Sequence, residues 1–387
     1  MKTLLCLIAC SLLWGCSTLG LTKVHDAFPG LRGLYESNVT TSVLVVHGMG
    51  YHSAGYSNQM QAGIMQRLDS TSKAASSVSY QVQLNGYPVG VVTRTQFTSP
   101  AGKRVVFVEL EWSDATRPIK RVLLGLADDD RERGFLQENR LSLNSAGKSF
   151  INSRLSDPMI YGGAFGEVLR GAAKTAICIL LRGDKDADSP QCDMADLDTG
   201  SGEIAIISSS MGSSLVFDTV SRLNELGTPK ERVALSAFLQ RSKRIYMFAN
   251  QIPLLDLREL GDVTGPNWLD AYPCPEKPPS SALPATGSHG LRNFLILRRN
   301  VAASDEALPS SLALNVVAFS DPNDLLTYGF SERFKSKCAP ARFANVTVTN
   351  AKAGWFFVAA NPIEAHTGYD VNTRVLDLIV HGGVPDQ

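Results

Sequence analysis

The segment from residue 203 to residue 226 constrains the fold most, because it joins a buried strand directly to a helix. Residues 203–207 form a short apolar run rich in β-branched side chains, which predicts a buried strand. A helical pattern begins at Met211 and continues to about Leu226. Ser210 therefore lies at the turn between the strand and the helix. One interpretation of this serine-rich turn is a helix cap, because Ser is a favoured N-cap residue.

Further apolar runs alternate with helical patterns along the chain. We expect strands at residues 41–46, 78–84, 104–112, 243–248, 312–319, 343–349 and 354–359. We expect helices at residues 56–70, 160–181 and 371–379, the second with a polar face made by Glu167, Arg170 and Lys174. Strands that alternate with helices favour a parallel sheet covered by helices. The sequence therefore predicts the α/β class with a mostly parallel central sheet.

A catalytic interpretation of Ser210 competes with the capping one. In a nucleophile elbow, the pattern Gly-x-Ser-x-Gly places a serine on a strained strand-to-helix turn, where small flanking residues let strand and helix pass closely. Gly212 fills the second glycine position, whereas Ser208 stands at the first. The Met211 N–H, at the start of the helix, is then expected to face a developing oxyanion.

A second motif, His47-Gly48-Met49-Gly50, follows the first clear strand. Acyl transfer needs two N–H donors for the tetrahedral intermediate, and the second comes from an early strand-to-helix loop. Gly48 allows close approach of the backbone, and we expect the Met49 N–H to be this donor. His47 precedes the nucleophile, so we expect it to shape the loop. His52 is expected either at the rim of the site or exposed to solvent, and we favour the exposed position.

Three histidines follow Ser210 in the sequence and are candidates for its general base. His366 lies in a predicted loop between the last strand and the last helix, from which it can reach a serine at the end of the sheet. His381 ends the last helix, where a histidine interacts favourably with the helix dipole. His289 lies in a segment rich in Ser and Pro. We therefore expect His366 to be the base.

The acid that orients this base is expected at a strand end between Ser210 and His366. Residues 320–324 supply two candidates, Asp321 and Asp324. We prefer Asp324, because an acid followed by aliphatic residues after a short turn is typical of this position. Asp321 precedes a proline and is the alternative acid, with turn formation as its simpler role.

These four motifs, in this order, resemble the α/β-hydrolase superfamily and its lipase- and esterase-like members. The resemblance implies an eight-stranded, mostly parallel sheet flanked by helices, with inserted cap or lid segments. It also implies hydrolysis of a carboxylic ester, possibly a lipid ester, through an acyl-enzyme on Ser210. Alternatives are a thioesterase or acyltransferase on the same fold, and a surface lipoprotein that only binds a partner. No cofactor is implied.

The N-terminus differs in character from the rest of the chain. A short positive start and an apolar stretch from Leu4 to Trp14 form a secretory signal pattern. Residues 13–16 resemble a bacterial lipobox, with Trp14 as a departure, so we expect Cys16 to be lipidated. The alternative is an ordinary cleaved signal peptide that happens to contain a cysteine. Ser17 after the cysteine implies the outer membrane as the destination. The expected organisation is a signal peptide over residues 1–15, a tether and lead-in over 16–40, and a hydrolase domain over 41–387 with insertions near 113–200 and 250–310.

The remaining cysteines fit an exported protein. Four of them lie in the mature chain, and an even number in an oxidising compartment suggests two disulfides. We favour Cys178–Cys192 and Cys274–Cys338, with four free thiols as the alternative.

Composition limits the classes of partner and ligand. The formal net charge is zero, so no nucleic-acid partner is expected. Asp184, Asp186 and Asp188 alternate as in a calcium loop, but Ser189 and Ala195 replace the glycine and the glutamate that such a loop requires. We therefore expect no metal site.

Overall fold

A computed structural model gives the arrangement of the chain. It describes residues 20–37, 39–126, 134–183, 192–197, 200–259, 290–303, 314–338, 341–351 and 360–385. The strand expected at 354–359, the signal segment, and most of the insertion expected near 250–310 lie outside these residues.

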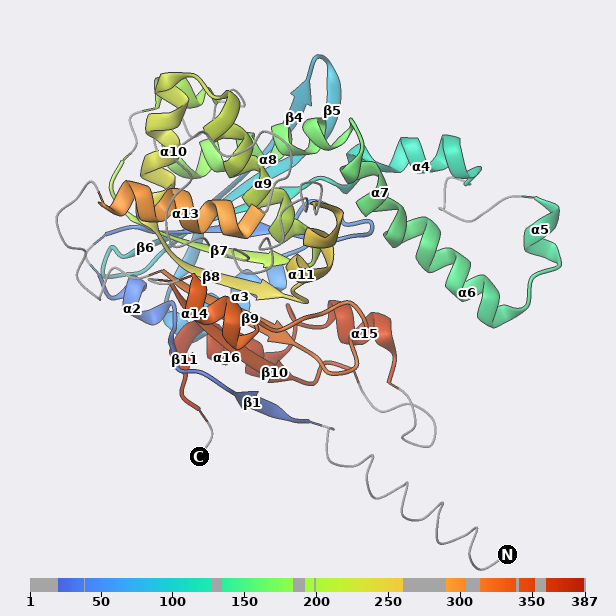
Figure 1. Ribbon diagram of the computed structural model, residues 1–387. Helices are drawn as coiled ribbons and strands as arrows, with labels where there is room; N and C mark the ends of the chain where they lie inside the picture. Colours follow the sequence, from blue (N-terminus) through green and yellow to red (C-terminus); the bar gives the residue numbers. More distant parts are fainter. Residues whose placement is uncertain are drawn as a thin grey trace, which may run out of the picture.

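A nine-stranded mixed sheet forms the centre of the protein (Figure 1). Its order is β1-β10-β9-β8-β7-β3-β6-β5-β4, and the six strands from β10 to β6 run parallel. Their bounds are β1 Thr22–Val24, β3 Thr41–Val46, β4 Lys73–Leu84, β5 Tyr87–Thr98, β6 Arg104–Glu111, β7 Glu203–Ser209, β8 Ser242–Phe248, β9 Asn315–Ser320 and β10 Arg342–Val348. The expected fold class is confirmed.

The expected number of eight strands is wrong within the part of the chain described here. β5 was not expected as a strand, and it forms an antiparallel hairpin with β4 at one edge of the sheet. β1, at the other edge, pairs antiparallel with β10. β1 is only three residues long and β5 mixes polar with apolar residues, so neither gives the continuous apolar run of a buried parallel strand.

Helices cover both faces of the sheet (Figure 1). One face carries α8 Gly166–Arg182, α9 Met211–Leu226, α10 Pro229–Arg241 and α13 Gly290–Ala303, and the other carries α2 Arg32–Tyr35, α3 Asn58–Leu68 and α16 Thr373–His381. Strand β3 shows why there are two cores. Val43 and Val45 belong to one apolar cluster, whereas Leu44 and Val46 belong to the other. Successive side chains of a strand point to opposite faces, so a fully apolar strand fills both cores.

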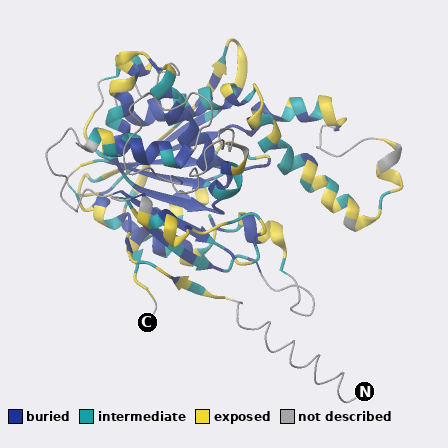
Figure 2. Cartoon of the chain, viewed as in Figure 1, coloured by how far each residue is buried: buried dark blue, intermediate teal, exposed yellow. Residues whose placement is uncertain are grey.

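Shorter elements complete the chain. They are η2 Ser113–Ala115, α4 Arg117–Leu124, α5 Phe135–Glu138, α6 Ser142–Phe150, η3 Ile151–Leu155, α7 Ser156–Gly162, η4 Met194–Asp196, α11 Ile252–Leu255, η5 Asp256–Glu259, α14 Glu332–Lys337 and α15 Pro362–Thr367, with a small sheet of β2 Phe28–Pro29 and β11 Gly382–Gly383. Helices α4 to α7 form an arm that projects from the body (Figure 1), and much of this arm is exposed (Figure 2).

Two elements show how the expected segments are used in the fold. The insertion expected near 113–200 contains α8, an amphipathic helix whose inner side is buried in the core. The lead-in over residues 16–40 contains β1, which belongs to the central sheet. The folded domain therefore begins before residue 41. No helix in the described ranges is long and apolar enough to cross a membrane.

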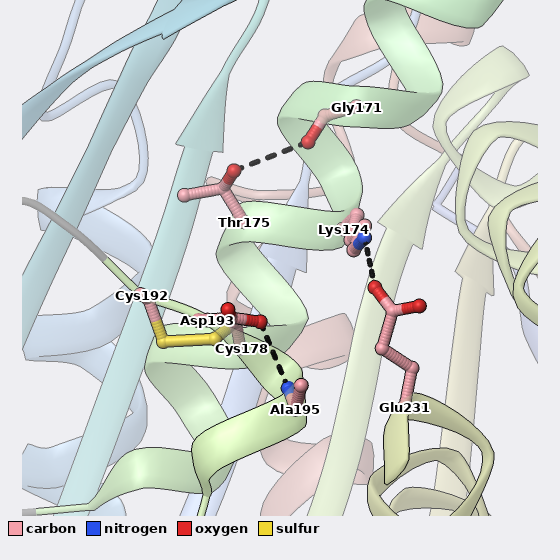
Figure 3. The surroundings of a disulfide bond; sticks show 8 residues. All are labelled: Gly171, Lys174, Thr175, Cys178, Cys192, Asp193, Ala195 and Glu231. Atoms are coloured by element: carbon pink, nitrogen blue, oxygen red, sulfur yellow. Dashed lines mark hydrogen bonds and ion pairs between the residues drawn. A yellow bond between two sulfur atoms is a disulfide. The ribbon is translucent and has the colours of Figure 1, made fainter. Parts of the chain in front are cut away.

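A disulfide bond joins Cys178, on α8, to Cys192 (Figure 3). It ties the segment before η4 to the buried helix, as the sequence suggested. Lys174 of the same helix pairs with Glu231 of α10. Cys338 is also disulfide-bonded, and its expected partner, Cys274, lies outside the described residues.

Candidate active site

Ser210 occupies a strained turn between β7 and α9. Its φ angle is 53° and its ψ angle is −127°, a conformation that side-chain-bearing residues rarely adopt. Its N–H donates to the carbonyl oxygen of Phe248 at 2.8 Å, which fixes the turn to the neighbouring strand. The residue stands at the N-cap position of α9, but its side chain makes no capping hydrogen bond. The capping interpretation is therefore wrong, and the hydroxyl is available for another partner.

That partner is His366, which in turn contacts Asp324. Nε2 of His366 lies 3.1 Å from Oγ of Ser210, and Nδ1 lies 2.8 and 2.9 Å from the two carboxylate oxygens of Asp324. All three side chains are buried. The base was expected on a loop, but it lies in the short helix α15. The structure thus brings the expected nucleophile, base and acid into one hydrogen-bonded chain.

The alternative acid, Asp321, has a different set of partners. One carboxylate oxygen accepts from the backbone N–H of Asn323, and the other accepts from the N–H groups of Asn350 and Ala351. These bonds join the loop after β9 to the loop after β10. Asp321 is completely buried and does not contact His366 within the described contacts. Its role is to hold the two loops that frame the site.

Tyr369 links the two aspartates and was not singled out from the sequence. Its hydroxyl accepts from the backbone N–H of Asp321 at 2.7 Å and donates to Asp324 at 3.4 Å. The ring is buried and stacks on Phe248. Burial raises the pKa of Tyr369 well above its ordinary value, so the phenol keeps its proton and can donate to the carboxylate. No local motif signals this role, because the contact depends on long-range packing.

The loop that follows β3 passes very close to the elbow. A Cβ atom at Gly48 would lie 2.6 Å from Cβ of Ser210, and one at Gly212 would lie 2.3 Å from the carbonyl oxygen of His47. Met49 lies next to Gly48 in this loop, and Met211 is the first residue of α9, whose N–H has no intrahelical acceptor. Both expected oxyanion donors therefore lie on segments that meet at Ser210.

Ser208, which replaces the first glycine of the elbow pattern, fits without strain. Its φ angle is not positive. Its hydroxyl is buried and lies 2.9 Å from the hydroxyl of Ser213 on α9. The position thus needs a small residue rather than a glycine, and the serine adds a hydrogen bond between strand and helix.

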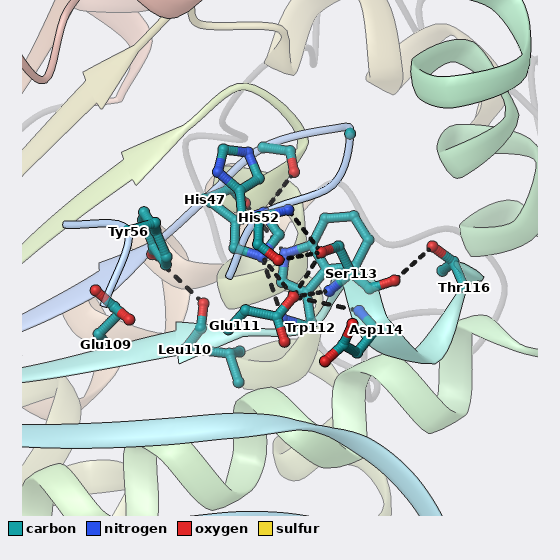
Figure 4. A network of polar contacts seen from close by, with 12 residues as sticks. His47, His52, Tyr56, Glu109, Leu110, Glu111, Trp112, Ser113, Asp114 and Thr116 are labelled. Carbon is teal, nitrogen blue, oxygen red and sulfur yellow. Dashed lines mark hydrogen bonds and ion pairs between the residues drawn. The ribbon is translucent and has the colours of Figure 1, made fainter. Parts of the chain in front are cut away.

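The side chain of His47 fixes the loop after β3 through a network of hydrogen bonds, part of which is shown in Figure 4. Nδ1 donates to the carbonyl oxygen of Gly48 at 2.8 Å, and Nε2 accepts from the N–H of Trp112 at 3.1 Å. Because Nε2 is an acceptor, the ring is neutral, in agreement with burial lowering the pKa of His47 to about 4. The ring also stacks on Trp112. Fixing the Gly48 carbonyl fixes the opposite direction of the Met49 N–H, because the peptide is planar and trans.

His52 is half-buried and lines the pocket, so the favoured exposed position is wrong and the alternative position at the rim of the site agrees with the structure. Its ring lies 4.1 Å from the ring of His47, and burial, followed by the nearby His47 and Arg154, lowers the pKa of His52 to about 3. Its N–H donates to Ser113, whose hydroxyl donates to the buried Glu111. His52 lines the pocket, whereas Glu111, at the end of β6, and Ser113, in η2, form the hydrogen bonds that support it (Figure 4). No sequence motif connects Glu111 and Ser113 to Ser210.

A second buried carboxylate, Glu109, holds the segment between the loop and α3. It accepts from the N–H of Gly55 and from both the N–H and the hydroxyl of Ser57. Burial raises the pKa of Glu109, while these donors act against the rise. The loop that carries Met49 is therefore anchored at both ends.

These elements line a pocket of about 60 Å³. Ser210 and His366 line it, together with apolar side chains such as Met60, Ile207 and Phe248. An apolar pocket that converges on a few polar groups is typical of a small-molecule site.

Other residues singled out from the sequence lie apart from this pocket or outside the described residues. His381 ends α16 and accepts a hydrogen bond from Arg32. His289, Cys16 and the alternating aspartates at 184–188 lie outside the described ranges. Among the residues that the structure describes, no group of His, Cys, Asp and Glu could hold a metal ion.

The sheet order and the strained serine turn after a central parallel strand together define the fold. It is the α/β-hydrolase fold. No protein-family model matches the sequence, and no curated protein does. Solved structures resemble the chain only distantly. An esterase from Pyrobaculum calidifontis has 11% identity and a TM-score of 0.30 over 98% of this chain and 92% of its own.

Two further structures are comparable. An esterase of Rhizomucor miehei has 11% identity and a TM-score of 0.29 over 98% of this chain and 88% of its own. A type II thioesterase from the borrelidin biosynthetic cluster has 11% identity and a TM-score of 0.27 over 92% of this chain and 96% of its own. Similarities at this level assign neither activity nor substrate, so the function is argued from the site.

Proposed function

We propose that the protein is a serine hydrolase that cleaves carboxylic esters through an acyl-enzyme on Ser210. The observation that carries the proposal is the buried chain from Ser210 through His366 to Asp324. Oγ of Ser210 attacks the ester carbonyl while Nε2 of His366 takes its proton. Asp324 holds the imidazole in the required tautomer and stabilises the imidazolium.

The oxyanion of the tetrahedral intermediate accepts hydrogen bonds from the N–H groups of Met49 and Met211. The alcohol then leaves with the proton from His366, and the acyl group remains on Ser210. Water attacks the acyl-enzyme with His366 as its base, and the acid is released. The apolar lining of the pocket supports an ester with an apolar portion, such as a lipid ester.

A fluorophosphonate probe tests the nucleophile. We expect the probe to label the wild-type protein and Ser209→Ala, but not Ser210→Ala. The Ser209 variant is a matched control, because its serine lies beside Ser210 and lines the same pocket. Labelling of Ser210→Ala equal to that of the wild type would rule out the assignment. Absence of labelling in the wild type would favour the alternative of a surface lipoprotein that only binds.

Rates with matched oxyesters and thioesters, and with water or an added alcohol as acceptor, separate the esterase from the thioesterase and acyltransferase alternatives. We expect oxyester hydrolysis to be the fastest of these reactions.

We also propose that the protein is exported and anchored to the outer membrane through a lipid on Cys16. The Cys178–Cys192 disulfide supports an oxidising compartment. Metabolic labelling with a fatty-acid analogue tests this proposal. We expect the label on the wild type and its loss in Cys16→Ser, and equal labelling of both would contradict it.

A further inference from the structure

Arg154 reaches the pocket of Ser210 from the projecting arm. It lies in η3, between α6 and α7, and its side chain lines the same pocket as Ser210 and His366. The guanidinium packs across Gly50, where an added Cβ would lie 3.2 Å from its Nη1 atom. The φ angle of Gly50 is +95°, so a glycine here allows both the turn and the approach of the arginine. A cation is thereby placed beside the loop that carries Met49.

Most of the hydrogen-bonding capacity of Arg154 is unused within the described part of the chain. A guanidinium has five N–H donors. Here one of them donates to the carbonyl oxygen of Met49, at a long 3.3 Å. No described carboxylate forms an ion pair with Arg154. Because Arg154 lines the pocket, a ligand bound there lies close to its side chain.

The nearest acid along the chain, Asp157, is already occupied. One of its carboxylate oxygens lies 2.6 Å from Nζ of Lys120 and accepts from the hydroxyl of Thr116, and the other accepts from the N–H of Gly50. Asp157 thus attracts Arg154 only at longer range. A half-buried arginine usually has a carboxylate partner, because removing its charge from water is costly. Arg154 has no such carboxylate partner among the described residues, and its side chain lines the pocket.

Arg154 is the cation among the charged side chains that line the pocket. His47 and His52 are neutral near pH 7, since both pKa values are lowered by burial. Asp370 also lines the pocket, and burial raises the pKa of its carboxyl group. A guanidinium matches the planar oxygens of a carboxylate or phosphate with two parallel hydrogen bonds.

From this geometry we infer that Arg154 binds a negatively charged oxyanion group, a carboxylate or a phosphate, that the ester substrate carries in addition to its scissile bond. The inference rests on the proposed ester hydrolysis at Ser210. The preferred substrates are then anionic esters, and Arg154 is the residue that selects them.

The test compares matched ester pairs that differ only in this charge. On the acyl side, the 4-nitrophenyl monoester of glutarate and 4-nitrophenyl 4-phosphonobutanoate are compared with 4-nitrophenyl valerate. On the alcohol side, the butyrate ester of 4-hydroxybutanoate is compared with butyl butyrate. A charge-assisted hydrogen bond corresponds to a preference of about 10- to 100-fold in kcat/KM. We expect such a preference in the wild type for at least one pair, its fall to near one in Arg154→Gln, and partial retention in Arg154→Lys.

The ratio of kcat/KM for the charged and the neutral ester of a pair does not depend on the fraction of folded enzyme. A partly unfolded variant therefore still gives a valid charge preference. Lys230→Gln removes the same charge from an exposed position on α10 and should keep the wild-type ratio. A wild-type ratio near one for every pair would overturn the inference. An unchanged ratio in Arg154→Gln, with all rates lowered together, would overturn it as well and would make Arg154 only a clamp on the Met49 loop.

These outcomes separate the two proposals. Probe labelling of Ser210 and hydrolysis of neutral esters without charge preference would reject the role of Arg154 alone. Absence of both labelling and hydrolysis would reject the serine hydrolase and, with it, this inference. The carboxylate and phosphonate arms identify which oxyanion group the site prefers.

Discussion

Gly48 faces Ser210 so closely that no larger residue fits between them. A Cβ atom at Gly48 would lie 2.6 Å from Cβ of Ser210, 2.9 Å from the carbonyl oxygen of Ser209 and 3.2 Å from Oγ of Ser210. The contact brings the loop after β3 against the elbow after β7, and these two strands are adjacent in the sheet. The short distance between Ser210 and the loop that carries Met49 thus depends on the absence of a side chain at Gly48.

We therefore expect Gly48→Ala to lower kcat/KM by at least about 100-fold, because the loop must move away from Ser210. Overpacking of this kind also costs about 1–3 kcal/mol of stability. Gly33→Ala is the matched control, since nothing lies within 4 Å of its added Cβ and it lies inside helix α2. Ester hydrolysis and urea unfolding of both variants check the prediction. A Gly48→Ala enzyme with wild-type activity would show that the loop does not supply a donor.

The two aspartates near His366 should respond differently to the same substitution. Asp324→Asn removes the acceptor that holds Nδ1 of His366, and we expect kcat to fall by about 10³- to 10⁴-fold with little change in fold. Asp321→Asn weakens the bonds to Asn350 and Ala351, and we expect it to lower the stability by about 1–3 kcal/mol.

Activity per folded molecule is the deciding measurement for this pair, with urea unfolding to determine the folded fraction. We expect Asp321→Asn to retain activity within about tenfold of the wild type, because it acts on the loops and not on the base. A larger loss of kcat in Asp321→Asn than in Asp324→Asn would assign the acid to Asp321 instead.

The buried His47 should make the protein less stable at mildly acidic pH. Its pKa is about 4 in the folded protein, against an ordinary value of 6.5. Between these values the unfolded chain binds more protons, so the contribution of His47 is complete above pH 6.5 and is lost as the pH falls towards 4. We expect the stability difference between wild type and His47→Gln to shrink by about 2 kcal/mol from pH 7 to pH 4.5.

Urea unfolding at the two pH values measures this change. The other titrating groups are present in both proteins, so their contributions cancel in the difference, apart from the part of the His52 shift that His47 causes. A difference that stays constant between the two pH values would mean that the histidine is not held neutral.

The Cys178–Cys192 disulfide should contribute measurably to stability, because it closes a short loop in the unfolded chain. Removing a cross-link across a loop of this length costs about 2–3 kcal/mol. We expect this loss in Cys192→Ala, which breaks the bond while the fully buried Cys178 stays in place. Guanidinium unfolding checks the value. Adding Cys178→Ala to this variant separates the cavity effect from the loss of the cross-link, and equal stability of Cys192→Ala and wild type would contradict the prediction.

The sequence by itself determined the elements whose signals are local. The apolar run of β7, the serine turn and the start of α9 at Met211 are adjacent in the chain, so short-range patterning was enough to predict them. The order of the serine, acid and histidine segments was also readable, because it is a property of the chain. The preference for Asp324 as the residue beside His366 rested on the same local pattern, and the structure places it there.

Only the tertiary structure decided which distant residues share the pocket. Tyr369 reaches Asp324, His52 packs on His47, and Arg154 crosses Gly50 through contacts between segments far apart in sequence. The edge strands β1 and β5 were missed for the same reason. β1 takes its place by pairing with β10, and its three residues carry too weak a pattern to predict that pairing. Packing and strand pairing are long-range interactions, and a local pattern cannot specify them.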